Sequence, residues 1–124
     1  MPNVPTIAII DDDEFVRDSM RTLVESVGYA TMAFSSAEEY INSNRIRNTS
    51  CLITDVQMPG MTGFDLHDRL IRDGYSIPII LMTGLPTERF KARARNSVAV
   101  DLLSKPIGLE CLMGSLEKAL NGAV

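Results

Sequence analysis

The sequence has no tryptophan and contains only two cysteines and one histidine in its 124 residues. Cys51 and Cys111 lack the spacing of a metal site and are too few for a disulfide framework, so both are expected to be reduced thiols in a cytoplasmic protein. No run of 18 or more apolar residues occurs, so no transmembrane helix is expected. Residues 1–5 have neither a basic start nor an apolar core, and they do not predict a secretory signal.

The sequence also lacks an excess of basic residues. Its formal net charge is −4, which gives no reason to expect that this domain itself binds nucleic acid. Hydrophobic residues make up 45% of the chain, enough for one globular domain with a buried core. Because no repeat or linker divides the chain, residues 1–124 are expected to form a single domain with its core over about residues 6–121. Any further domain is expected to lie outside this sequence.

Short apolar runs alternate with segments of helical periodicity along the whole chain. Strands are predicted for residues 6–10, 29–34, 51–54, 78–82 and 98–103. Helices are predicted for residues 14–27, for a short segment opened by a Ser36/Glu39 capping box, and for residues 63–73, 87–96 and 109–120, the last stopped near Gly122. Residues 42–50 are polar and irregular. This alternation predicts an α/β fold with a five-stranded parallel sheet of flavodoxin-like order 2-1-3-4-5 and helices on both faces.

Asp55 comes at the end of the apolar run of residues 51–54 and is followed by the Pro59-Gly60 turn. Ligands and chemistry gather at the carboxyl ends of strands in open α/β sheets, so Asp55 is a candidate phosphoryl acceptor. A carboxylate can act as a nucleophile and form an acyl phosphate. The alternative is that Asp55 simply caps a turn, as aspartate often does.

Charged or hydroxyl side chains also follow the other central strands of the predicted sheet. The set is Asp11 and Asp12, then Asp55, then Thr83, then Ser104 with Lys105. In the order 2-1-3-4-5 the first and third strands are neighbours, so three carboxylates are expected to converge at one edge. Two carboxylates about 5 Å apart repel by roughly 3 kcal/mol at an effective dielectric of about 20. Three of them therefore predict a bound cation, and their hard oxygen atoms suit Mg²⁺.

These strand-end motifs together resemble those of a known signalling family. The matching segments are Ile10-Asp11-Asp12-Asp13, Thr54-Asp55-Val56-Gln57-Met58-Pro59-Gly60-Met61-Thr62-Gly63, Thr83-Gly84 and Ser104-Lys105-Pro106. In this order and spacing they resemble the receiver domains of two-component response regulators, in particular the FixJ-type branch. The resemblance covers about residues 6–121.

The resemblance implies a role for each residue of the acidic cluster. Asp55 would accept a phosphoryl group from a sensor histidine kinase or a histidine phosphotransfer protein. Asp12, Asp55 and the backbone carbonyl of Gln57 would hold Mg²⁺, with Asp11 acting mainly through water. The domain would undergo Mg²⁺-dependent self-phosphorylation and dephosphorylation without the turnover of a true enzyme.

The resemblance also implies a switching mechanism. Thr83 would bind the phosphoryl oxygens and shift on activation, and Lys105 would pair with the phosphate, held by a cis peptide bond to Pro106. The face formed by the fourth helix, the fifth strand and the fifth helix would change and control a partner, a homodimer or a DNA-binding output domain outside this chain. Leu102 stands at the switch position where the family usually has an aromatic residue, and Ile107 stands where a FixJ-type chain usually has Phe. Aromatic switching is therefore not expected in its usual form.

Two other functions remain open from the residues alone. Asp11-x-Asp13 resembles the start of a haloacid-dehalogenase-type phosphatase motif, although Phe15 stands where that motif has Thr or Val. A non-phosphorylated adaptor of the same fold is the second alternative, although such proteins usually lose an acid or the lysine.

Smaller features are left with two interpretations each. Gln57 and Leu85 either tune dephosphorylation or belong to neutral loops. The cations of residues 89–95 form either a solvated face or a docking surface. His67 is expected to be packed or exposed rather than catalytic, because it does not lie at the carboxyl edge.

Overall fold

A five-stranded parallel sheet forms the centre of the computed structural model, which describes residues 4–121. The strand order is β2-β1-β3-β4-β5, so the predicted topology is confirmed. The strands are β1 (Thr6–Ile10), β2 (Ala30–Phe34), β3 (Cys51–Asp55), β4 (Ile79–Thr83) and β5 (Asp101–Ser104).

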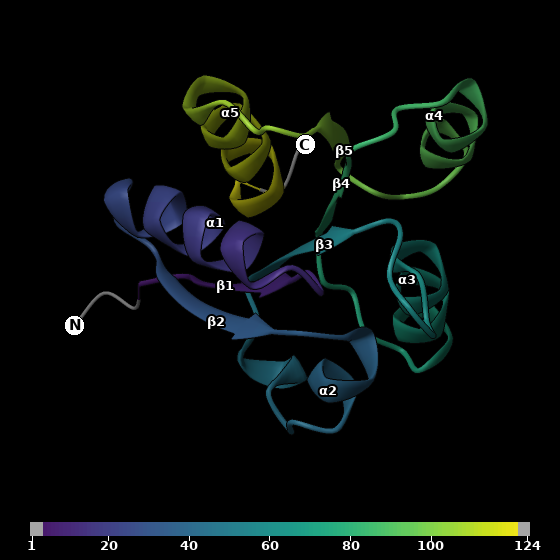
Figure 1. The fold of residues 1–124 in the computed structure, drawn as a ribbon. Coiled ribbons are helices and arrows are strands. Elements are labelled where there is room, and N and C mark those ends of the chain that lie inside the picture. Colours follow the sequence, from purple (N-terminus) through teal and green to yellow (C-terminus); the bar gives the residue numbers. More distant parts are fainter. Residues whose placement is uncertain (1–3, 122–124) are drawn as a thin grey trace.

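Five α-helices surround the sheet on its two faces. They are α1 (Glu14–Ser26), α2 (Ala37–Ile41), α3 (Gly63–Arg72), α4 (Glu88–Arg95) and α5 (Leu109–Leu120), with a short 3₁₀ helix η1 (Ile46–Asn48). Helices α1 and α5 lie side by side over one face, and α2 and α3 cover the other (Figure 1). Helix α4 stands beside β5 at the edge of the sheet. Among the described residues, none of the helices has the length and apolar character needed to cross a membrane.

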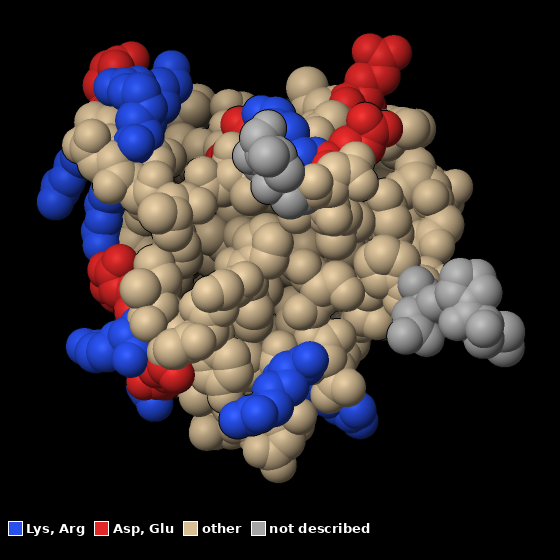
Figure 2. All heavy atoms as spheres, turned by 180° about the vertical axis from the view of Figure 1, so that it is seen from behind, with Lys and Arg blue, Asp and Glu red and all other residues tan. Residues whose placement is uncertain are grey.

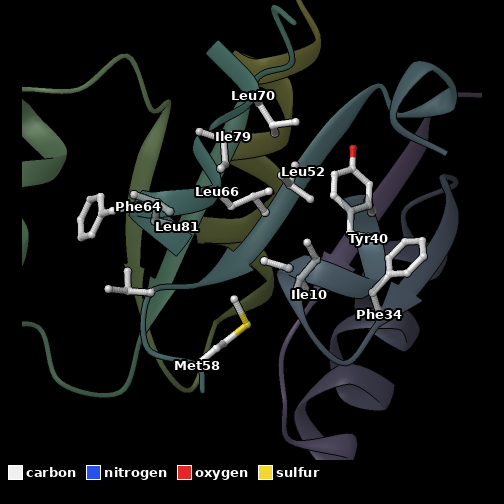
Figure 3. Close-up of a cluster of buried hydrophobic side chains, with 13 residues drawn as sticks. Ile10, Phe34, Tyr40, Leu52, Met58, Phe64, Leu66, Leu70, Ile79 and Leu81 are labelled. Carbon is white, nitrogen blue, oxygen red and sulfur yellow. The ribbon is translucent and has the colours of Figure 1, made fainter. Parts of the chain in front are cut away.

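The core is divided by the sheet into two apolar layers. Side chains alternate between the two faces of a strand, so in β3 Leu52 packs with α2 and α3 while Ile53 packs with α1 and α5. Tyr40, Leu66 and Ile79 join Leu52 in the first layer (Figure 3). Because all five residues of β3 and of β4 are buried, these strands form a rigid base for the residues at their carboxyl ends.

Strand register decides which side chains meet at the carboxyl edge. Ile10 of β1 pairs with Thr54 of β3, so Asp11 and Asp55, the next residue of each chain segment, lie next to each other. On the far side, Thr83 of β4 pairs with Ser104 of β5, which brings Lys105 to the same edge.

Apart from shifts of one residue at the ends of elements, the structure differs from the expectations in the start of β5, in residues 42–50 and at the cap of α2. Strand β5 begins at Asp101 rather than residue 98, because the Ser97 hydroxyl accepts a hydrogen bond from the Ala99 amide (3.1 Å) and forms a local turn. The polar segment of residues 42–50 contains η1, and Ile46 packs against the core.

At the start of α2, Ser36 accepts from the Glu39 amide as predicted, but the Glu39 carboxylate accepts from the Ser35 amide, one residue earlier than in a capping box. The predicted stop at Gly122 lies outside the described residues.

Candidate functional site

Lys105 joins two buried carboxylates at the carboxyl edge of the sheet. Its Nζ donates to Asp11 Oδ2 at 2.8 Å and to Asp55 Oδ2 at 2.9 Å. Asp11 follows β1, Asp55 ends β3 and Lys105 follows β5, so residues separated by up to 94 positions in the sequence meet at one point. Asp11 is fully buried and Asp55 is 6% exposed, so this ion pair is shielded from solvent.

Asp12 completes an acidic cluster on the solvent side of this ion pair. One carboxylate oxygen from each of Asp11, Asp12 and Asp55 lies within 4.8 Å of the others. Asp12 is exposed whereas the other two are buried, so the cluster opens toward water on one side. Hard oxygen donors with room for water are what Mg²⁺ prefers, and the donor set therefore fits the cation expected from the sequence.

Burial and charge shift the pKa values of the two central groups. Burial raises the pKa of Asp55, and the charge of Asp11 adds to this, while the hydrogen bond from Lys105 opposes it. Burial lowers the pKa of Lys105, but its hydrogen bonds to Asp11 and Asp55 outweigh that cost, so the pKa of the amine lies above its usual value. Lys105 is therefore held as a cation, in contact with a carboxylate that is costly to keep charged.

The loop after β3 holds the Asp55 carboxylate through a backbone amide. The Gln57 amide donates to Asp55 Oδ1 at 3.1 Å, and the Gln57 side chain is exposed. A Cβ atom on Gly63 would lie 2.5 Å from the Asp55 carbonyl oxygen, closer than any real contact. Only glycine therefore permits α3 to begin against the acidic cluster.

Thr83 and Lys105 are linked by the backbone at the end of β4. The Lys105 amide donates to the Thr83 carbonyl at 2.8 Å, and the Lys105–Pro106 peptide bond is cis, as the resemblance implied. Thr83 is fully buried, and its hydroxyl oxygen accepts from the Leu85 amide at 3.0 Å. The hydroxyl hydrogen has no acceptor within residues 4–121, so it is available to an incoming oxygen.

Leu102 lies apart from the acidic cluster. It pairs with Leu81 in the sheet, is half-buried, and packs against the apolar layer that contains α2 and α3. A hollow of about 370 Å³ lies beside it between α4 and β5, lined also by Ala94 and Ala99. The structure therefore places this expected switch residue between the sheet and α4.

Two residues of the site were not found from the sequence. The Arg17 guanidinium donates to the Asp11 carbonyl at 2.8 Å, and the Glu38 carboxylate accepts from the Met61 amide at 3.0 Å, which holds the loop after β3. The Arg17 contact was only weakly indicated by the sequence, since Arg17 lies one helical turn after Asp13. The Glu38 contact was not indicated by the sequence at all, because Glu38 and Met61 are 23 positions apart.

An apolar groove of about 320 Å³ begins at Lys105 and runs along α1. Phe15, Val16, Pro106 and Ile107 line it. Phe15 is 79% exposed, which is unusual for a large apolar side chain. The groove gives an approaching protein an apolar surface next to the acidic cluster.

Basic side chains gather at the side of the molecule where α4 lies (Figure 2). Arg93 lies 4.4 Å above the ring of Phe64 and 3.6 Å from the Asp68 carboxylate, and Lys91 lies 3.7 Å from Glu88. The two ion pairs are at the surface, whereas the Phe64 ring is buried. Part of this charge is thus used to hold α4 against α3.

The fold and the site together define an α/β domain whose carboxyl edge carries three carboxylates and a bridging lysine. Residues 7–117 match the model of the family described as "Response regulator receiver domain". The chain therefore belongs to the response regulator receiver domain family, as the sequence motifs indicated.

Curated relatives extend this comparison. The response regulator protein TmoT of Ectopseudomonas mendocina is 37% identical over 114 residues, which cover 92% of this chain and 52% of TmoT. Nodulation protein W of Bradyrhizobium diazoefficiens is 41% identical over 100 residues, which cover 81% of this chain and 44% of that protein. The chain thus spans about half the length of the curated relatives it matches.

Solved structures of receiver domains have the same fold as this chain. The crystal structure of FixJ-N superposes with a TM-score of 0.85 at 29% identity, covering 100% of this chain and 98% of FixJ-N. A receiver domain from Clostridium thermocellum superposes with a TM-score of 0.88 over 97% of both chains, and at 24% identity it supports the fold alone.

Proposed function

We propose that this chain is a phosphorylation-dependent signalling switch in which Asp55 accepts a phosphoryl group from a phosphohistidine. The donor is a sensor histidine kinase or a histidine phosphotransfer protein. The observation that carries the proposal is the pair of hydrogen bonds from Lys105 Nζ to Asp11 and Asp55, at 2.8 and 2.9 Å, beside a third carboxylate within reach of the same cation. Such a cluster of carboxylates is costly unless a cation offsets its charge.

The transfer is an in-line displacement at phosphorus. An ionised Asp55 oxygen forms the new P–O bond while the P–N bond to the donor imidazole breaks. The nitrogen keeps the electron pair and takes up a proton from water. The Lys105 ammonium and the Thr83 hydroxyl donate to the phosphoryl oxygens, where charge is spread in the transition state.

The acidic residues are proposed to hold Mg²⁺. Asp12, Asp55 and the Gln57 carbonyl would bind it, with Asp11 acting through water or directly. When bound, Mg²⁺ supplies positive charge that offsets the carboxylates and the phosphoryl oxygens. The chain's own contribution is to fix Asp55 through the Gln57 amide and to hold Lys105 in its charged form.

The groove beside Lys105 supports docking of the histidine-bearing partner there. Its apolar lining by Phe15 and Ile107 fits apolar side chains of a helix pair that presents the phosphohistidine. We propose no enzymatic turnover: the domain phosphorylates itself once and loses the group by hydrolysis. Gln57 and Leu85, which flank the site, are candidates to set the rate of that loss.

We propose that phosphorylation changes the face formed by α4, β5 and α5, and that this face controls a homodimer, a partner or an output domain. Residues 1–124 would then form one receiver domain of a cytoplasmic regulator, with a DNA-binding output domain outside this sequence. Relatives such as the transcriptional regulatory protein FixJ of Bradyrhizobium diazoefficiens, of which the matched region covers 57%, support such an arrangement.

The test is phosphorylation by a small phosphodonor with Mg²⁺, followed by intact-mass analysis. The parent chain should gain one phosphoryl group, and Asp55→Asn should gain none. Asp13→Asn is the matched control, because Asp13 caps α1 and asparagine caps a helix equally well. It should be phosphorylated like the parent.

The same variants separate the alternatives. A phosphatase of the haloacid-dehalogenase type would lose activity in Asp13→Asn and would turn over a phosphomonoester. An adaptor would gain no phosphoryl group at all. If the Asp55→Asn variant gains the group as readily as the parent, the proposed function is refuted.

A further inference from the structure

A second hollow lies at the opposite edge of the sheet from the acidic cluster. It has a volume of about 520 Å³ and lies between the C-terminal halves of α3 and α5, at the starts of β4 and β5. Its walls are mostly apolar, from Ile71, Tyr75, Ile77 and Val98. A volume of this size falls within the range of small-molecule sites.

His67 faces this hollow without a hydrogen-bond partner. Six polar or charged side chains are buried in the described part of the chain: Asp11, Thr54, Asp55, His67, Thr83 and Ser115. The other five all take part in side-chain hydrogen bonds. His67 is only 4% exposed and has none within residues 4–121. No fully buried side-chain nitrogen or oxygen of the described residues is left unpaired, so the His67 ring nitrogens are open to the hollow, where a ligand group can bond to them.

Among the described side chains that line the hollow, Lys118 carries the only fixed charge, and burial lowers the pKa of His67. Lys118 lines it together with His67, and no acidic residue of the described chain does. The nearby carboxylates are already engaged: Asp101 accepts from Lys118 at 3.3 Å and from Ser115 at 2.8 Å, and Asp68 pairs with Arg93 at 3.6 Å. An anionic group in the hollow would therefore meet the His67 imidazole and the Lys118 ammonium, and it would share that ammonium with Asp101.

We infer that this hollow binds a small organic anion with an apolar body, of the class of aromatic carboxylates. The carboxylate accepts hydrogen bonds from the His67 imidazole and the Lys118 ammonium. The apolar body lies against Ile71, Ile77 and Val98. The site shares no residue with the Asp55 cluster, so it goes beyond phosphoryl transfer and its test is independent of that function.

The experiment uses benzoate as the probe and the imidazole of His67 as the reporter. The chain has a single histidine, so its ring protons give one unambiguous NMR signal. Titration of the whole chain with benzoate should shift this signal saturably, with a dissociation constant on the order of 1 mM, as expected for so small a ligand. Benzyl alcohol, which has the same ring without the charge, should bind at least about tenfold more weakly.

Variants locate the site through the amide signals of residues 74–77, which adjoin the hollow. His67→Leu and Lys118→Gln should each weaken benzoate binding by about tenfold. Lys91→Gln removes a cation beside the other hollow, next to Leu102, and should leave binding unchanged. If His67→Leu does not fold, Lys118→Gln and the parent titration carry the test.

Three results would overturn the inference. They are the absence of a saturable shift with benzoate, equal binding of benzyl alcohol and benzoate, and equal benzoate affinity in Lys118→Gln and the parent.

Discussion

At the scale of single residues, the charged acidic cluster lowers the stability of the folded chain. Asp55 is buried next to Asp11, and burial raises the pKa of its carboxyl group. Lys105 offsets part of this cost through its two hydrogen bonds, and the pKa of its amine rises accordingly. A buried carboxyl group whose pKa is raised next to another carboxylate is typical of functional sites.

The replacement Asp55→Asn should therefore stabilise the chain at neutral pH in the absence of metal. Because the folded-state pKa of Asp55 is raised, the folded chain binds more protons than the unfolded chain between the usual aspartate pKa and the raised value. The parent thus loses stability as the pH rises through that window, and the asparagine variant does not. Urea unfolding across acidic to neutral pH measures the difference.

The control for this experiment is Asp18→Asn, which removes the same charge from an exposed position of α1. It should change the free energy of unfolding by less than about 0.5 kcal/mol at any pH. If Asp55→Asn proves less stable than the parent at neutral pH, the ion pair with Lys105 outweighs the cost of burial and the prediction is wrong.

The site residues differ in how far the sequence predicts them. Asp11, Asp12, Asp55, Thr83 and Lys105 were predicted because each follows a short apolar strand, and parallel strands end at one edge. The contact of Arg17 with the Asp11 carbonyl depends on the rotation of α1 about its axis, which periodicity alone does not define at that precision. The sequence left the burial of His67 open, because its position in α3 fits both a packed and an exposed side chain.

At the scale of elements, α4 is the helix least embedded in the core. None of its residues is buried, although Phe90 and Ala94 pack against the core and Arg93 contacts the Phe64 ring. The ring centroids of Phe90 and Phe64 lie 6.2 Å apart, and the Arg93 guanidinium lies 4.4 Å from the centroid of the Phe64 ring. Phe90 supplies an aromatic contact between α4 and the core.

Phosphorylation of Asp55 should change amide hydrogen exchange in residues 84–107, and Phe90→Ala should remove most of that change. Without its ring, α4 loses its main apolar contact and exchanges rapidly in both states. The variant should also lose roughly 1 to 2 kcal/mol of stability, since Phe90 is half-buried. Exchange mass spectrometry with and without the phosphodonor measures both states.

Phe15→Ala is the matched control, because Phe15 is exposed and lies on α1. It should keep the exchange response and cost less than about 0.5 kcal/mol of stability. Identical exchange in residues 84–107 with and without the phosphoryl group would contradict the proposed coupling between Asp55 and the α4 face.

The elements were predictable where pattern alone decides them. The apolar runs of β1, β3 and β4 are continuous because both faces of these strands are covered, and their bounds were predicted closely. The predicted start of β5 was wrong because the Ser97 side chain bonds to its own neighbouring backbone, a local competition that the apolar residues 98–100 conceal. The 3₁₀ helix η1 has three residues, too few to show a period.

At the scale of the whole molecule, the strand order places an acidic cluster and an apolar hollow at opposite edges of one sheet. The neighbouring positions of β1 and β3 bring Asp11, Asp12 and Asp55 together at the carboxyl edge. The amino-terminal edge carries the hollow at His67. Helix α3 runs between them, since Gly63 at its start touches the Asp55 carbonyl and His67 lies in its second turn.

The central claim is that the phosphoryl group is carried by Asp55 and by no other acid of the cluster. The most direct measurement treats the chain with a small phosphodonor and Mg²⁺, reduces the product with borohydride, which converts an acyl phosphate to an alcohol, and locates the altered residue by peptide mass spectrometry. We predict reduction at Asp55 alone. Reduction at Asp11 or Asp12, or a phosphoryl group that borohydride does not remove, would contradict the account.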